Sequence, residues 1–346
     1  MRRTGLVVLL SLVVVGPMHG QTEMKGQIPS DVYSRPAELL AVDGERRLNM
    51  FCMGNGSPAV ILISGAWENT MPWRLVQEPA SHLGRACSYD RAGLGFSDPA
   101  TRPSTARATV DDLKSLLDAA SIEKPVLVGH SAGGLYALLF TALYPDRVAG
   151  LVLVDPHDPE ANHNTAMSGS PEIARAERRQ IEATNQLLRH CVDLAREGSL
   201  TPDNTDPYCL MKEADPLLKA ELDRQHVRLQ TKEAVLSELI SLDTVVEDDY
   251  SLDEGEFRKA IRDRNFGRLP LVLLRRGIRQ KHPALPQQIF EQNEKIFLAG
   301  YERIAAYSTT GELRTVPDSG HQIQLDQREA VVAAIREVVA AARATR

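Results

Sequence analysis

The residues best suited to chemistry form the sequence Gly-His-Ser-Ala-Gly at positions 129–133, with Ser131 at its centre. A short apolar run, residues 125–128, precedes it, and a second apolar run with helical propensity, residues 135–143, follows. This order predicts a strand, a sharp turn and a helix, with glycines where the two elements crowd together. The Ser131 hydroxyl would stand clear of the sheet at a helix N-terminus, which favours developing negative charge. We expect Ser131 to be a nucleophile; the alternative is an ordinary Gly/Ser turn.

A serine hydroxyl is a weak nucleophile and needs a base within hydrogen-bond reach. His321 is the candidate because it follows a predicted strand, residues 312–316, and a glycine. That position lies at the sheet edge where Ser131 also emerges. His130, beside the nucleophile, is interpreted as structural, and the alternative for His321 is a simple loop or surface residue.

The elements that must position these residues alternate between strands and helices. Apolar runs at 59–63, 85–89 and 150–154 flank helical patterns on either side of the Ser131 motif, which predicts a doubly wound α/β core. From residue 156 to about 267 the alternation stops and only helix signals remain. The predicted division is a signal peptide at 1–21, a flexible lead-in at 22–36, a first core part at 37–155, an all-helical insertion at 156–267 and a second core part at 268–346.

The N-terminal residues have the pattern of a leader peptide for export. Arg2 and Arg3 precede an apolar run, residues 6–15, that is too short to span a bilayer. We therefore expect a cleavable signal peptide and a secreted or periplasmic protein; an uncleaved anchor is the alternative, and the cleavage position is not defined. The formal net charge of −6 argues against nucleic acid or an anionic membrane surface as a partner.

Four cysteines in an exported chain favour disulfide pairing. Cys52 and Cys87 lie in strand-like runs, whereas Cys191 and Cys209 lie close together in the helical middle region. The cysteines alone allow three connectivities. Metal ligation is the rival interpretation, but the chain has no CxxC motif and no tight His/Cys cluster, so no metal is expected.

Three stretches resemble the α/β-hydrolase superfamily: residues 129–133, the loop Tyr-Asp-Arg-Ala-Gly-Leu-Gly-Phe-Ser-Asp at 89–98, and Ser-Gly-His at 319–321. The resemblance covers roughly residues 37–155 and 268–346. It implies an α/β fold with an eight-stranded, mostly parallel sheet, and an inserted helical cap over the active site. It also implies that the catalytic acid lies between the nucleophile and the histidine in sequence, and that no cofactor is needed.

The acid of the triad departs from the family's usual pattern. The family more often places it after the seventh strand, but the corresponding residues 275–282 contain no carboxylate. Lipases of the pancreatic type instead carry the acid at the end of the sixth strand, and Asp155 has that position. Asp155 would fix the tautomer of His321 and stabilise its imidazolium. A structural role for Asp155, with Asp158 as the next candidate acid, is the alternative.

The resemblance also implies an oxyanion hole of two backbone N–H groups. One belongs to Ala132, and the register of the loop after the third strand puts the other on Ala66, with Trp67 as runner-up. The charged residues of the 89–98 loop are interpreted as a structural brace.

The family's sheet order bears on the cysteines, because its second strand is antiparallel and lies beside the fourth. This neighbourhood implies a Cys52–Cys87 bond, which leaves Cys191 to pair with Cys209 across a short loop in the insertion.

The resulting interpretation is an exported serine hydrolase that cleaves a small-molecule ester, or less readily an amide or lactone, through an acyl-Ser131 intermediate. Haloalkane dehalogenases and epoxide hydrolases of this fold need a carboxylate nucleophile, which Ser131 is not. The alternatives are a non-hydrolytic small-molecule binding protein and an acyltransferase. The sequence defines neither the acyl length nor the oligomeric state.

Overall fold

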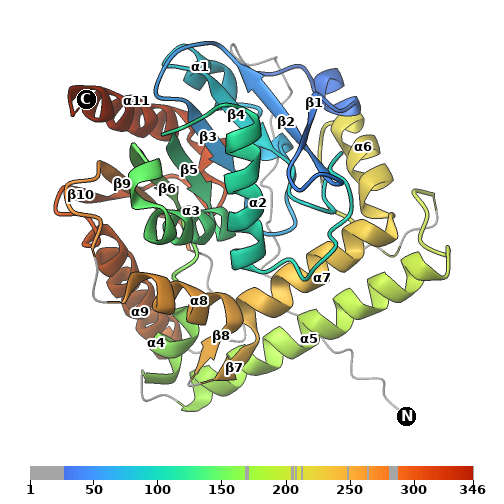
Figure 1. Ribbon diagram of the computed structural model, residues 1–346. Coiled ribbons are helices and arrows are strands. Elements are labelled where there is room, and N and C mark those ends of the chain that lie inside the picture. Colours follow the sequence, from blue (N-terminus) through green and yellow to red (C-terminus); the bar gives the residue numbers. More distant parts are fainter. Residues whose placement is uncertain are drawn as a thin grey trace.

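The chain folds around a single large sheet (Figure 1). The computed structural model describes residues 27–167, 171–203, 206, 209–211, 213–247, 249–262, 265–279 and 287–345. The strands of the large sheet are β1 (Glu38–Ala41), β2 (Arg47–Met53), β3 (Val60–Ile63), β4 (Ala86–Tyr89), β5 (Val126–His130), β6 (Gly150–Val154), β9 (Leu271–Arg276) and β10 (Gly311–Val316).

The strand order is β1-β2-β4-β3-β5-β6-β9-β10, and only the pairings of β2 with β1 and β4 are antiparallel. The predicted eight-stranded, mostly parallel sheet is therefore confirmed. Neighbouring residues of a strand point to opposite faces. Ile61 and Leu127 join one core cluster with α2 and α3, whereas Val60 and Val126 join another with α11. Both faces are covered, as the continuous apolar runs predict.

The helices cover these two faces and form the insertion. Those outside the insertion are α1 (Gln77–Ser81), α2 (Ala106–Ala119), α3 (Ala132–Leu143), α9 (Gln287–Ala305), α10 (Ile323–Asp326) and α11 (Arg328–Ala344), with short 3-10 helices η2 (Met71–Trp73) and η3 (Pro145–Arg147). The parallel strands all end at one edge of the sheet. The residues that follow β3, β5, β6, β9 and β10 are therefore brought close together there.

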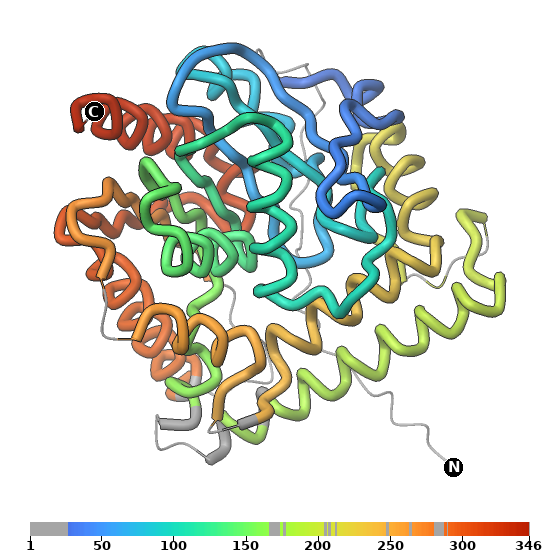
Figure 2. The backbone as a smooth tube through the Cα atoms, viewed as in Figure 1, coloured from blue at the N-terminus to red at the C-terminus, as the bar shows by residue number. Residues whose placement is uncertain are grey.

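The insertion between β6 and β9 contains α4 (Ala161–Met167), α5 (Pro171–Arg196), α6 (Pro216–His226), α7 (Leu229–Asp243) and α8 (Leu252–Ile261). Figure 2 shows most of these segments along the lower side of the molecule, whereas α6 rises along its right side. The prediction that the insertion is all-helical is wrong in one place, because β7 (Val245–Glu247) and β8 (Tyr250–Ser251) form a small antiparallel hairpin. Its turn includes Asp249 at a φ of 64°. The strand before the turn begins with Val245 and Val246, and β-branched residues of this kind favour an extended backbone.

The lead-in also departs from expectation over its described part, residues 27–36. Here η1 (Ser30–Ser34) forms a 3-10 helix, and Ile28 and Tyr33 are buried against α6. The Ser30 hydroxyl donates a 2.6 Å hydrogen bond to Asp215. The polar composition of the lead-in, with Pro29 and Pro36, predicts a flexible segment, but its few apolar side chains pack on a hydrophobic surface of α6.

The predicted signal peptide, residues 1–21, lies outside the described residues. Among the residues that are described, no helix is both long and apolar enough to cross a membrane.

Two disulfides are present, and both predicted pairings are confirmed. Cys52 and Cys87 lie directly opposite each other on β2 and β4, with their Cα atoms 4.1 Å apart. Cys191 and Cys209 join α5 to the segment before α6, with a Cα–Cα distance of 5.5 Å. The bonds span 35 and 18 residues of sequence. By loop entropy each would stabilise the fold by roughly 3–4 kcal/mol.

Candidate active site

Ser131 occupies a sharp turn between β5 and α3, with φ 52° and ψ −121°. A positive φ is uncommon outside glycine and marks a backbone held by its surroundings. The surroundings here are crowded, since a Cβ added to Gly133 would lie 2.2 Å from the carbonyl oxygen of Ile63. Glycine at position 133 therefore lets α3 begin directly against β3, and the turn carries Ser131 past the end of its strand.

Asp155 follows the neighbouring strand β6 and is also held at a positive φ, 43°. The Ser131 N–H donates to the carbonyl of Val154 at 3.1 Å, and the His157 N–H donates to the carbonyl of Ser131 at 2.9 Å. The chain leaving Asp155 thus runs directly alongside Ser131. Two of the predicted site residues are brought together in this way, at the carboxyl ends of adjacent parallel strands.

His321 comes from the loop after β10 and meets Asp155. Its Nδ1 lies 2.5 Å from Asp155 Oδ2. The other carboxylate oxygen, Oδ1, accepts a 3.0 Å hydrogen bond from the Tyr301 hydroxyl and a 3.1 Å bond from the Arg276 N–H. The Arg276 guanidinium is ion-paired with Oδ2 at 3.1 Å. Asp155 therefore holds His321 while its own orientation is set from β9 and α9.

The charges around this pair keep Asp155 ionised and His321 neutral. Burial alone would raise the pKa of Asp155, but the hydrogen bond from His321 and the positive charge of Arg276 outweigh it, so the pKa lies well below its usual range. Burial lowers the pKa of His321 below its ordinary value; the bond to Asp155 opposes this, and the charge of His130 adds to it. A neutral imidazole beside a carboxylate is the state that a general base requires.

Asp158, the alternative candidate for the acid, forms hydrogen bonds with other side chains. Its carboxylate accepts two hydrogen bonds from Arg303, at 2.7 and 3.0 Å, and a further bond of 3.0 Å from Asn164. These contacts tie the start of the insertion to α9. The geometry favours Asp155 over Asp158 as the partner of His321.

The loop of residues 64–67, here called the oxyanion loop, lies against Ser131. A Cβ added to Gly65 would be 3.2 Å from the Cβ of Ser131. The N–H of Trp67, the runner-up oxyanion donor, already donates a hydrogen bond to Glu238 at 2.8 Å and is not free to bind an oxyanion. The N–H groups of Ala66 and Ala132 have no acceptor within the described part of the chain. These two therefore remain the candidates to bind an oxyanion.

A second buried network, missed by the sequence interpretation, braces the site. His130 contacts Glu68 Oε2 through Nδ1 at 3.2 Å, and its Nε2 lies 3.0 Å from the carbonyl oxygen of His321. Glu68 also accepts from the N–H of Gly65 at 2.8 Å and from the amide of Gln322 at 2.7 Å. Burial would raise the pKa of Glu68, but His130 and these donors lower it to about 2. The network joins the oxyanion loop, the turn that carries Ser131 and the loop that carries His321.

No local sequence signal points to Glu68, Tyr301 or Arg276, because each acts through a partner far away in the chain. The absence of a carboxylate in residues 275–282 was the one available hint that this loop has a different role. Among the residues that the structure covers, no group of three or more His, Cys, Asp or Glu side chains is arranged to hold a metal ion.

The position of Arg276 predicts an effect on pH dependence. His321 must be neutral to accept a proton, so kcat/KM should fall at low pH with a midpoint below 6.5, because burial lowers the His321 pKa. The charge of Arg276 lowers that pKa further. Replacing Arg276 with Gln should therefore move the acid limb to higher pH, as measured by kcat/KM between pH 4.5 and 9.

The matched control is Arg275→Gln. Arg275 is the preceding residue on β9 and points to the opposite face, where its Nε donates to Thr315 at 2.8 Å. Its profile should match the wild type. An acid limb that stays in place in Arg276→Gln, or moves equally in Arg275→Gln, would contradict this account.

Comparison with known proteins places the chain in a family. A family model described as alpha/beta hydrolase fold matches residues 58–327. An uncharacterized protein of Mycobacterium tuberculosis (strain ATCC 25618 / H37Rv) is 31% identical over 124 residues, which is 36% of each chain. The 2-hydroxymuconate semialdehyde hydrolase of Pseudomonas sp. (strain CF600) is 35% identical over 114 residues, or 31% of this chain and 39% of that protein. The chain thus spans less than half the length of these curated relatives.

A solved structure extends the similarity over nearly the whole fold. A thermophilic esterase from Thermogutta terrifontis superimposes with a TM-score of 0.54 at 22% identity, covering 88% of this chain and 97% of that one. At this identity the likeness concerns the fold alone.

Proposed function

This chain belongs to the α/β-hydrolase family, and from that premise we propose that it is a serine hydrolase which cleaves a carboxylic ester through an acyl-Ser131 intermediate. The observation that carries the proposal is the 2.5 Å contact between His321 Nδ1 and Asp155 Oδ2, with Ser131 held in a strained turn whose N–H bonds the carbonyl of Val154, the residue before Asp155. A buried carboxylate that orients a histidine near such a serine is the arrangement by which triads activate the hydroxyl.

In the first half-reaction His321 takes the proton of the Ser131 hydroxyl through Nε2 while the oxygen attacks the ester carbonyl. Asp155 holds the Nδ1 hydrogen and stabilises the imidazolium that forms. The negative charge that develops on the carbonyl oxygen is received by the N–H groups of Ala132 and Ala66. Collapse of the tetrahedral intermediate breaks the ester C–O bond, and His321 returns its proton to the departing alkoxide.

In the second half-reaction a water molecule replaces the alcohol. His321 removes a proton from this water, the hydroxide adds to the acyl carbonyl, and the proton passes back to Ser131 as the acid is released. The insertion contacts the core through α7 and α8, which pack on α2 and α3, and through Glu238 of α7, which accepts from the Trp67 N–H of the oxyanion loop. We therefore propose that it is a cap which selects substrates.

Export is part of the same proposal. It is supported by the N-terminal leader pattern and by two disulfides, which persist in oxidising compartments. Recovery of the native protein only from the reducing cytosol, with four free thiols, would argue against it.

The deciding experiment treats the purified protein with a fluorophosphonate probe and maps the labelled peptide. Covalent modification of Ser131, together with hydrolysis of p-nitrophenyl esters of graded acyl length, is the expected result. A non-hydrolytic binding protein has no activated serine and would not label. An acyltransferase would label, but it would form product faster when an alcohol or amine acceptor is added.

A further inference from the structure

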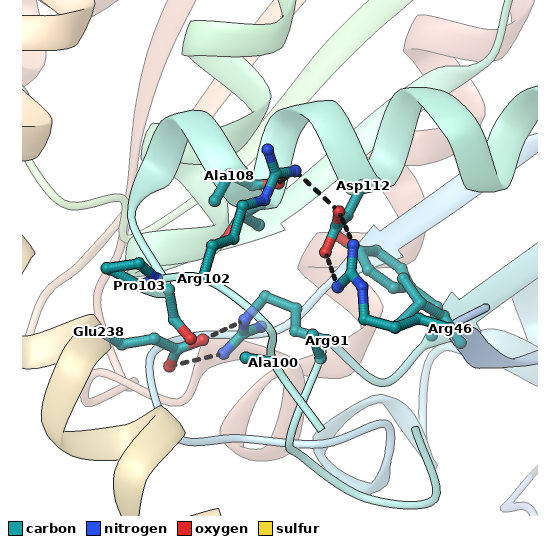
Figure 3. Close-up of a pocket in the computed structure, with 13 residues that line it drawn as sticks. Arg46, Arg91, Ala100, Arg102, Pro103, Ala108, Asp112 and Glu238 are labelled. Carbon is teal, nitrogen blue, oxygen red and sulfur yellow. Dashed lines mark hydrogen bonds and ion pairs between the residues drawn. The ribbon is translucent and has the colours of Figure 1, made fainter. Parts of the chain in front are cut away.

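Glu238 is a carboxylate of the insertion that reaches the core and has no part in the chemistry described above. It lies on α7, and its side chain is only 1% exposed. Its Oε1 accepts a 2.6 Å hydrogen bond from Arg91 Nε, and its Oε2 accepts bonds of 3.1 Å from Arg91 Nη2 and 2.8 Å from the Trp67 N–H. Figure 3 shows the two side chains facing each other, with Glu238 projecting from its helix toward Arg91.

Arg91 also donates hydrogen bonds to two backbone carbonyls of the oxyanion loop. Its Nη1 donates to the carbonyl of Ser64 at 2.9 Å, and its Nη2 donates to the carbonyl of Gly65 at 2.7 Å. The N–H of Gly65 is held separately by Glu68. The backbone groups on both sides of Ala66 are therefore bonded to charged, buried side chains.

Arg91 and the Glu68 N–H, which donates to the same oxygen at 3.3 Å, together orient the Gly65 carbonyl and hence the Ala66 N–H. These two groups belong to one peptide unit, which is planar and trans, so they point in opposite directions. Anchoring the oxygen on Arg91 directs the hydrogen of Ala66 away from Arg91. The loop meanwhile lies against Ser131, as the 3.2 Å approach of a Cβ at Gly65 indicates.

We propose that Glu238 and Arg91 form a buried clamp through which the insertion sets the direction of the Ala66 N–H, so that the insertion contributes to transition-state stabilisation as well as to substrate selection. Glu238 and Arg91 are positioning residues here, since neither would touch the substrate. The inference rests on the proposed function, because it assigns the Ala66 N–H to the oxyanion.

The chemistry of the pair suits this role. A guanidinium is always charged and presents its donors in a rigid fork, so it can bind a carboxylate on one edge and two carbonyls on another. Water would compete for the same donors at an exposed site, but both side chains are almost fully buried. Without the Glu238 carboxylate, Arg91 would be a buried charge with no counter-ion. Any movement of α7 would act on both Arg91 and Trp67.

The test compares Glu238→Gln with Asp253→Asn. Asp253 is an equally buried carboxylate of the insertion that accepts from a core N–H, that of Ala106 at 2.7 Å, but it has no contact with the oxyanion loop. A glutamine at position 238 has one accepting oxygen for donors that now use two, so the loop loses at least one anchor. Glu238→Gln should lower kcat for a p-nitrophenyl ester by about 10- to 100-fold, with KM within about threefold, because losing one oxyanion donor altogether costs about 10²- to 10³-fold.

Inhibition by a trifluoromethyl ketone, whose serine adduct carries the oxyanion, should weaken by a similar factor in Glu238→Gln. Asp253→Asn should keep the wild-type kcat and the same inhibition. If Glu238→Gln fails to fold, Glu238→Asp keeps the charge beside Arg91 but is too short to reach every donor, and it should show the same loss of kcat. Wild-type kcat and inhibition in a folded Glu238 variant would overturn the clamp. A wild-type protein that neither labels nor hydrolyses esters would instead refute the proposed function, and the clamp with it.

Discussion

Replacing Ser131 with Ala is expected to lower kcat/KM for an activated ester by roughly 10⁴- to 10⁶-fold and to abolish labelling by a fluorophosphonate. The reason is that the hydroxyl forms the bond to the acyl group. Within the described chain, no other serine combines a place directly after a strand, a positive φ and the neighbourhood of the Asp155–His321 pair. The His321→Ala variant should be impaired to a similar extent, since the two residues act as one unit. The measurement is a progress curve at high enzyme concentration together with mass spectrometry of the probe-treated protein.

Ser199→Ala provides the control, because Ser199 is an exposed serine of the insertion whose hydroxyl donates to the carbonyl of Leu194 at the end of its own helix. It should label and turn over like the wild type. Labelling that persists in Ser131→Ala at another serine, with substantial esterase activity, would show that the nucleophile has been assigned to the wrong residue.

The second large effect concerns the acid. Asp155→Asn is expected to lower kcat by roughly 10³- to 10⁴-fold while the protein stays folded. An amide NH₂ facing His321 Nδ1 would force the imidazole proton onto Nε2, where it would block proton transfer from Ser131. Tyr301 and the Arg276 N–H, which now donate to one carboxylate oxygen, could still bond the amide oxygen. Steady-state kinetics and circular dichroism of the variant make the comparison.

Asp158→Asn separates this assignment from its alternative. Asp158 is paired with Arg303, so its replacement should lower the melting temperature but leave kcat per labelled active site within about threefold. Near-normal turnover in Asp155→Asn combined with an inactive Asp158→Asn would reverse the assignment of the acid.

The sequence was informative wherever a local pattern determines the local structure. The strand, turn and helix around Ser131 are contiguous, so their apolar runs and glycines predict the turn without knowledge of the rest of the chain. The N-cap of α6 is equally local, because Asp215 stands directly before Pro216 and accepts from the N–H groups of Leu217 and Leu218. The order of strands required a different source, the resemblance to a family, and the Cys52–Cys87 pairing followed from it.

Local patterns failed where a short segment packs on a distant one. The lead-in at residues 27–36 has too few apolar side chains to predict structure, yet Ile28 and Tyr33 are buried because α6 offers them a hydrophobic surface. The small β7–β8 hairpin inside the helical insertion is a similar case, since two or three residues per strand leave no clear period.

By itself the sequence determined the turn around Ser131, the α/β alternation and the candidates Ser131 and His321, and the resemblance to a family added Asp155. Only the tertiary structure decided which charged groups surround them. Arg276 meets Asp155 across 121 residues of sequence, and Glu238 meets Trp67 across 171. A buried charge requires a partner wherever the fold brings one within reach. Such pairs depend on how segments pack in space, and hydrophobic periodicity carries no record of that packing.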